Sequence, residues 1–248
     1  MDGALHSQEQ LREPSARQLR FSEHDSYSVD RMEEAQVIRS WIRVGAAAGI
    51  VASLALPLAQ MIPFPVQGLV WIVSIFGVAI SLSSIGLYHL LALHQKTLSL
   101  VIGCASNVVA GVMVNCMLIV QLAINAAMRP LSAEPPAGIS PEALGLLWEG
   151  LGKVHLGLDI VWDIYLCLGS FLVAWNMRRH PRFGMLFAIP GMVVSVALWV
   201  LNVQTFPTPP GEAGLVDLGP VLGFWYLIVA IQMVRSLKWA DGRLNGHR

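Results

Sequence analysis

The stretch VGAAAGIVASLALPLAQMIPFPVQGLVWIVSIFGVAISLSSIGLYHLLALHQ, residues 44–95, contains no Asp, Glu, Lys or Arg. A helix on the surface of a soluble domain carries charged residues on its solvent side, and this stretch has no such side. About 20 consecutive apolar residues are needed to cross the hydrocarbon core of a bilayer, which is roughly 30 Å thick. The stretch is therefore long enough for two crossings, and Pro63 and Pro65 mark the break between them.

Further stretches without a charged residue cover residues 97–128, 183–211 and 218–234. Only 13% of the chain is charged, whereas about 25% is usual in a soluble domain. We therefore predict an all-α membrane protein, a bundle of six transmembrane helices. Their expected ranges are about 44–62, 68–93, 98–128, 154–177, 183–206 and 215–237.

The basic residues predict the orientation of the bundle, because Lys and Arg gather in cytoplasmic loops. Of the 16 basic residues, only Arg129 and Lys153 fall on the side opposite to the two termini. We therefore expect an N-in, C-in topology, with both termini in the cytoplasm. In outline the chain resembles small bacterial six-helix membrane proteins, which implies a multi-pass location in the plasma membrane.

The polar segments outside the six ranges give further expectations. Residues 1–40 predict a largely disordered cytoplasmic tail that ends in a short interfacial helix, and residues 240–248 predict a short C-terminal tail. The tail could contact a membrane or cytoplasmic protein partner, but no basic face suggests nucleic acid. Ser140, Pro141 and Glu142 form an N-cap, a first-turn proline and an acidic first turn. They predict a short extracytoplasmic helix that leads into the fourth span.

Small and amide residues inside the spans predict how the helices pack. Glycine and serine recur at spacings of three and four in residues 44–62 and 68–93, which favours close helix crossings. In residues 98–128, Asn107 and Asn115 share one stripe. An asparagine in hydrocarbon is costly unless it bonds to another helix, so both are expected to join helices.

The fourth span differs from the others because it carries ionisable residues. His155, Asp159 and Asp163 are four residues apart and therefore share one helix face. At 1.5 Å per residue, Asp163 lies roughly 12–14 Å below the outer boundary, near the middle of the bilayer. A carboxylate there costs several kcal/mol unless it is paired, hydrated or protonated, and such residues usually mark a functional pathway.

Other polar residues are expected at the same depth, and they predict an outward-facing polar cavity. In this prediction Asp159 and Asp163 bind a small solute, cation or proton, and His155 tunes them. The remaining residues line the site: Gln121, Asn125, Asn202 and Asp217. From residue 129 to residue 217 this side holds seven acidic residues against two basic ones, which favours cations. Alternatively, these groups only fix the register of the helices.

Two other classes of function stay open at this point. His155, Asp159 and Asp217 could hold a divalent metal in an intramembrane hydrolase, since imidazole and carboxylate are ordinary zinc ligands. No other cofactor is predicted. A structural or regulatory subunit is the second alternative. The sequence contains no His-Glu-x-x-His and no Gly-x-Ser-Gly, and the CAAX-protease-like Glu33-Glu34 lies before the first span. A non-enzymatic binding or transport protein is therefore the leading hypothesis.

Overall fold

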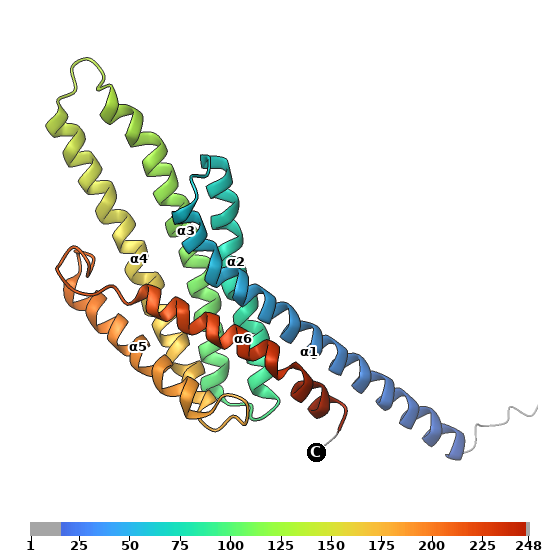
Figure 1. Ribbon diagram of the computed structural model, residues 1–248. Helices are drawn as coiled ribbons and strands as arrows, with labels where there is room; N and C mark the ends of the chain where they lie inside the picture. The colour runs from blue at the N-terminus through green and yellow to red at the C-terminus, as the bar shows by residue number, and fades with distance from the viewer. Residues whose placement is uncertain (1–15, 247–248) are drawn as a thin grey trace, which may run out of the picture. The chain divides into compact units, whose positions relative to one another are not determined.

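The computed structural model describes residues 16–246, and this part of the chain contains helices but no strands. Each of its six helices contains a segment long and apolar enough to cross a membrane, which identifies an integral multi-pass membrane protein. Figure 1 labels the six helices in chain order. Their bounds are α1 (Ala16–Met61), α2 (Val66–Ala92), α3 (Leu98–Ala133), α4 (Pro141–Met177), α5 (Gly184–Thr205) and α6 (Gly219–Leu244).

The described part of the chain divides into two units, residues 16–37 and residues 38–246. In the first unit, every residue from 16 onward belongs to α1, which continues into the second unit without a break. The sequence predicted a largely disordered tail over residues 1–40 that ends in a short interfacial helix; residues 1–15 lie outside the described part, and the tail stays a prediction. No proline or glycine occurs between residues 15 and 44, so nothing in the sequence interrupts the helix.

Helix α4 begins at Pro141, where the sequence predicted the start of a short extracytoplasmic helix. Ser140 caps α4 as predicted, because its hydroxyl oxygen accepts a hydrogen bond from the Ala143 N–H at 3.2 Å. The helix then continues through Gly150 and Gly152 to Met177 in one piece. A glycine inside a helix costs only about 1 kcal/mol relative to alanine, which the apolar residues around it can offset.

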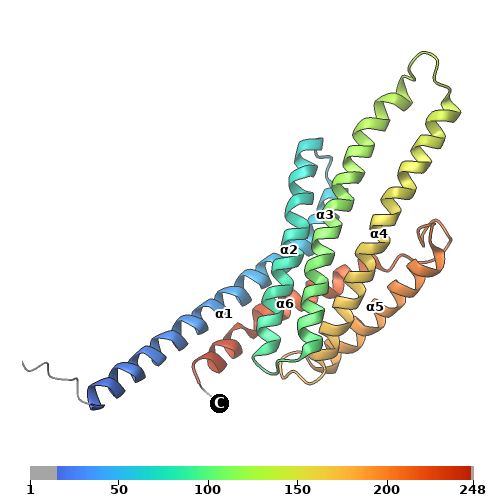
Figure 2. The same cartoon turned by 180° about the vertical axis from the view of Figure 1, so that it is seen from behind.

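The second unit is a bundle in which α3 packs against α2 and α4, and α4 also packs against α5. Figures 1 and 2 both show α3 and α4 side by side, extending beyond α2 and α5 where the α3–α4 loop joins them. We name this end of the bundle the 3–4 end. The opposite end, which carries the α2–α3 and α4–α5 loops, is the 4–5 end.

Glycines allow the helices to approach closely, as the small-residue spacings predicted. A Cβ atom on Gly45 of α1 would lie 2.6 Å from the Cα atom of Gly86 of α2. A Cβ atom on Gly77 of α2 would lie 2.1 Å from the carbonyl oxygen of Gly111 of α3. Real Cβ atoms do not come this close to backbone atoms, so these crossings require glycine.

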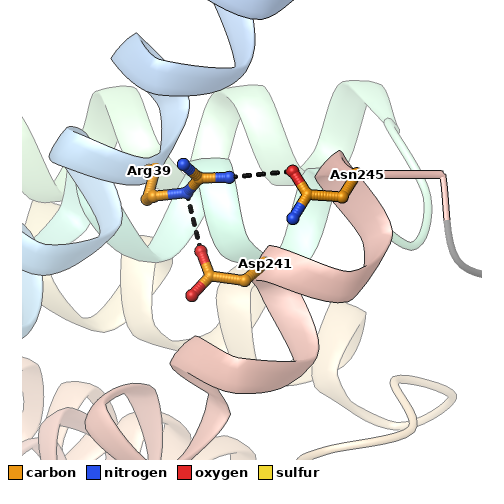
Figure 3. Close-up of polar contacts among 3 residues, drawn as sticks. All are labelled: Arg39, Asp241 and Asn245. Carbon is orange, nitrogen blue, oxygen red and sulfur yellow. Dashed lines mark hydrogen bonds and ion pairs between the residues drawn. The ribbon is translucent and has the colours of Figure 1, made fainter.

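An ion pair joins α1 and α6 within the second unit. Figure 3 shows Arg39 near Asp241 of α6 and Asn245, the residue that follows α6. The Nε atom of Arg39 lies 2.7 Å from Oδ1 of Asp241, and its Nη2 donates to Oδ1 of Asn245 at 3.1 Å. The Arg39 and Asp241 side chains are 29% and 35% exposed, so water weakens the attraction between the two charges.

Candidate functional site

Three ionisable residues lie along the middle of α4: His155, Asp159 and Asp163. The helix is continuous across His155, Asp159 and Asp163, so all three side chains project from one face. Asp163 is buried, with 6% of its surface exposed, and the other two are half-buried. A carboxylate is rarely buried in a membrane helix without a partner, which makes this face the candidate site.

Asp217, in the segment before α6, approaches the same face. It lies close enough to both Asp159 and Asp163 for their charges to interact, and Asp159 also interacts with His155. The exposed Asp217 carboxylate accepts a hydrogen bond from the Gly219 N–H at 2.8 Å, which fixes its position at the start of α6. We call Asp159, Asp163 and Asp217 the acid cluster. Helix α4 and the segment before α6 therefore place three carboxylates within range of one another's charges.

The polar groups of this face are not paired with one another. Within residues 16–246, neither Asp159 nor Asp163 makes a hydrogen bond or a salt bridge through its side chain. The Nε2 atom of His155 and the Nε1 atom of Trp162 are buried there and also have no hydrogen-bond partner. A cluster that only fixed helix register would be expected to satisfy its donors and acceptors, as most buried polar groups do. This face does not.

Asn115 shows what a structural polar group looks like in this bundle. Its Nδ2 donates to the carbonyl oxygen of Ser74 at 3.2 Å, and its Oδ1 accepts from the Gly77 N–H at 2.9 Å. The predicted interhelical bonding is confirmed for this residue. Asn107, two turns earlier on α3, differs: it is completely buried, and neither Nδ2 nor Oδ1 has a hydrogen-bond partner among the described residues.

Three of the predicted lining residues are not seen to join the acid cluster. In the described part, the side chains of Gln121, Asn125 and Asn202 form no hydrogen bond, and Gln121 is exposed. The predicted cavity likewise stays a prediction. An open hollow of about 260 Å³ lies instead on α5, where its walls are Trp199, Val200, Val203 and Gln204.

The metal alternative gains no support from the geometry. Among residues 16–246, no three His, Cys, Asp or Glu side chains come together closely enough to hold one metal ion. A zinc site needs three or four such ligands within about 2.0–2.3 Å of the ion. The metal-binding role of His155, Asp159 and Asp217 therefore stays a prediction.

A second polar group, which the sequence did not predict, lies further along α4. The Ser170 hydroxyl is 2.7 Å from the Tyr226 hydroxyl of α6, and it donates to the Leu166 carbonyl oxygen at 2.6 Å. Asn107 lies near enough to Tyr226 to interact with its hydroxyl. A Cβ atom on Gly169 would lie 2.1 Å from Oδ1 of Asn107, so glycine leaves room for the carboxamide. We call Asn107, Ser170 and Tyr226 the amide–hydroxyl cluster.

Comparison with known proteins does not show the family of this chain. No family model matches it, and no solved structure matches it. Phospholipid-transporting ATPase 1 of Arabidopsis thaliana is 28% identical to it over 108 residues. This similarity covers 44% of the chain and 8% of that protein, so the chain spans less than a tenth of that relative's length.

Proposed function

We propose that this protein binds a small solute or cation on the polar face of α4 and moves it into or across the membrane. The observation that carries the proposal is the Asp163 carboxylate, which is 6% exposed and unpaired among the described residues, in a helix able to span a bilayer. A carboxylate in that position costs several kcal/mol. A bound cation would offset this cost, which explains why the acid is tolerated.

The other members of the acid cluster increase the attraction for a cation. Like charges on Asp159, Asp163 and Asp217 repel one another, so a positive charge between them lowers the energy of all three. In this proposal Asp159 and Asp163 bind the cation or a proton, and Asp217 completes the site from the α6 side. His155 tunes Asp159, with which its charge interacts.

The orientation of the site follows from the distribution of basic residues. The 4–5 end carries Lys96, Arg178, Arg179 and Arg182 in its two loops, whereas the loops of the 3–4 end contain no Lys or Arg. By the positive-inside rule, the 4–5 end and both termini face the cytoplasm of a plasma membrane. The acid cluster then opens to the extracytoplasmic side. Gln121, Asn125 and Asn202 would form the polar wall at the same depth.

Transport assays with two probe cations test this proposal. The full chain would be reconstituted into vesicles, and uptake of radioactive Na⁺ and of protons would be measured separately. We expect the wild type to take up at least one probe and Asp163→Asn to reduce that uptake at least tenfold. Glu142→Gln is the matched control, because Glu142 is an exposed acid on the same helix outside the acid cluster. Equal uptake by the wild type and Asp163→Asn would contradict the proposal.

The partial similarity to a phospholipid-transporting ATPase does not determine the substrate. It covers 8% of that protein, too little to include the parts that a pump of that size requires. The proposal therefore rests on the acid cluster alone.

A further inference from the structure

The amide–hydroxyl cluster continues the polar face of α4 toward the 4–5 end. Ser170 is seven residues after Asp163, and seven residues are close to two full turns, so both side chains project from one face. The rise of 1.5 Å per residue places Ser170 about 10 Å further along the helix. Seven more residues lead to Met177, where α4 ends. Polar groups therefore recur on this face of α4 from His155 to Ser170.

Packing alone does not explain Asn107. Its side chain is completely buried, and neither polar atom makes a well-formed hydrogen bond among the described residues, although Asn107 lies near enough to interact with the Tyr226 hydroxyl. An unsatisfied buried amide costs about 1–3 kcal/mol, and a leucine of similar size would avoid that cost. Asn115 on the same helix shows that an asparagine here can satisfy both atoms when it serves to join helices. Asn107 therefore has polar groups available for something that is not part of the fold.

We propose that Asn107, Ser170 and Tyr226 form a second cation site, to which an ion passes from the acid cluster on its way to the 4–5 end. The inference rests on the proposed function and adds that the polar face is a path through the bundle and not a closed binding site. The ligands would be three oxygen atoms from three helices: Oδ1 of Asn107, Oγ of Ser170 and the Tyr226 hydroxyl oxygen.

The chemistry of these ligands favours a small monovalent cation, either Na⁺ or hydronium. All three oxygen atoms are neutral, and none of the three residues is a carboxylate. Divalent cations such as Ca²⁺ and Mg²⁺ are usually bound with one or more carboxylates, because their dehydration is costly. A singly charged cation needs less compensation, and neutral hydroxyl and carboxamide oxygens suffice. The ion leaves the charged acid cluster for a weaker neutral site, which allows it to move on.

The test measures cation binding and cation flux separately in the full chain. Binding of radioactive Na⁺, and of protons by pH titration, would be measured in detergent, and uptake of each would be measured in vesicles. Tyr226→Phe removes one ligand and keeps the ring, and Asn107→Leu removes another with an apolar side chain that branches at the same atom. We expect both variants to bind the cation within twofold of the wild type but to transport it at least tenfold more slowly. The probe whose uptake falls identifies the ion.

Two controls keep the result interpretable. Tyr165→Phe removes the hydroxyl of an exposed tyrosine on α4 and should leave the flux unchanged. Ser170→Ala serves as a third test if Asn107→Leu does not give a monodisperse protein. Unchanged flux in Tyr226→Phe and Ser170→Ala would overturn this inference and leave the acid cluster as a site. Binding without any uptake by the wild type would also overturn it. A wild type that binds neither cation would overturn the proposed function as well.

Discussion

The Asn115 carboxamide oxygen of α3 accepts a hydrogen bond from the Gly77 N–H of α2 at 2.9 Å. This bond joins two helices at a crossing that only glycine permits, because a Cβ atom on Gly77 would overlap the backbone of α3. Asn115 is therefore an example of a polar residue that stabilises the fold, because both of its polar side-chain atoms are hydrogen-bonded. Asp163 and Asn107 do not make such hydrogen bonds within the described part of the chain.

Asn115→Ala should destabilise the bundle, since it removes both hydrogen bonds to α2. Interhelical hydrogen bonds in membranes contribute about 0.6 to 2 kcal/mol, so we expect a loss of about 1–2 kcal/mol. Asn107→Leu should be neutral or stabilising, because it removes buried polar atoms that have no partner. Thermal unfolding in detergent measures the change in stability of both variants. If Asn107→Leu destabilised the protein as much as Asn115→Ala, Asn107 would be structural.

Gly77→Ala should be among the most damaging alanine substitutions in the bundle. The added Cβ would meet the Gly111 carbonyl oxygen and the Asn115 side chain, so α2 and α3 would have to separate. Overpacking of this kind typically costs about 1–3 kcal/mol. Gly157→Ala on α4 is the control, because no atom lies within 4 Å of its added Cβ. Equal unfolding temperatures for the two variants would show that the α2–α3 crossing is looser than described.

The Arg39–Asp241 pair should contribute little to stability at physiological salt. Both side chains are about one-third exposed, and exposed ion pairs contribute roughly 0.2–1 kcal/mol. A double-mutant cycle of Arg39→Ala and Asp241→Ala should therefore give a coupling free energy below about 1 kcal/mol, and the coupling should weaken as salt is added. A larger coupling that is insensitive to salt would indicate that water does not reach the pair.

We expect the protein to lose stability in acid because of His180, which lies in the loop between α4 and α5. Burial, and after it the positive charge of the neighbouring His94, lower the pKa of His180 from 6.5 to about 4. The charges of Arg182 and Arg243 act in the same direction, whereas the Leu90 carbonyl raises this pKa. The ring is 2% exposed and packs edge-on against Trp239, with ring centroids 4.9 Å apart.

The sign of the pH effect follows from the two protonation states. Above about pH 6.5 neither the folded nor the unfolded chain protonates His180, so it adds no pH dependence. Between pH 6.5 and pH 4 the unfolded chain binds a proton that the folded chain does not, so acid favours unfolding. The loss approaches about 3 kcal/mol near pH 4. His180→Phe should make the unfolding temperature less dependent on pH over this range. An unchanged slope would mean that other groups cause the acid sensitivity.

The six helices could be predicted from the sequence because the segments that would cross the lipid bilayer contain few or no charged residues. Residues 44–95 alone indicate two spans, and the structure has α1 and α2 there. The ends of the helices were harder to predict. Gly150 and Gly152 are weak helix breakers, and apolar neighbours outweigh them, so α4 continues through both. The sequence of α1 before residue 44 is polar but contains no breaker, and such a segment can be helical or disordered.

The candidate site could be predicted only in part. The shared face of His155, Asp159 and Asp163 follows from their spacing alone, which needs no tertiary information. The hydrogen bond between Ser170 and Tyr226 depends on how α6 packs against α4, and sequence spacing contains no signal for that. The spacing of seven between Asp163 and Ser170 was the only available hint. Asn202, Gln121 and Asn125 were placed by depth, which does not determine which way a helix faces.

Direct binding of a cation to the purified full chain tests the central claim most closely. Equilibrium dialysis against radioactive Na⁺, with pH titration for protons, would compare the wild type with Asp163→Asn and with the Glu142→Gln control. We predict saturable binding of one of these cations by the wild type and the control, and affinity at least tenfold weaker in Asp163→Asn. Equal affinity in all three proteins, or no binding by the wild type, would contradict the account of α4 as a cation site.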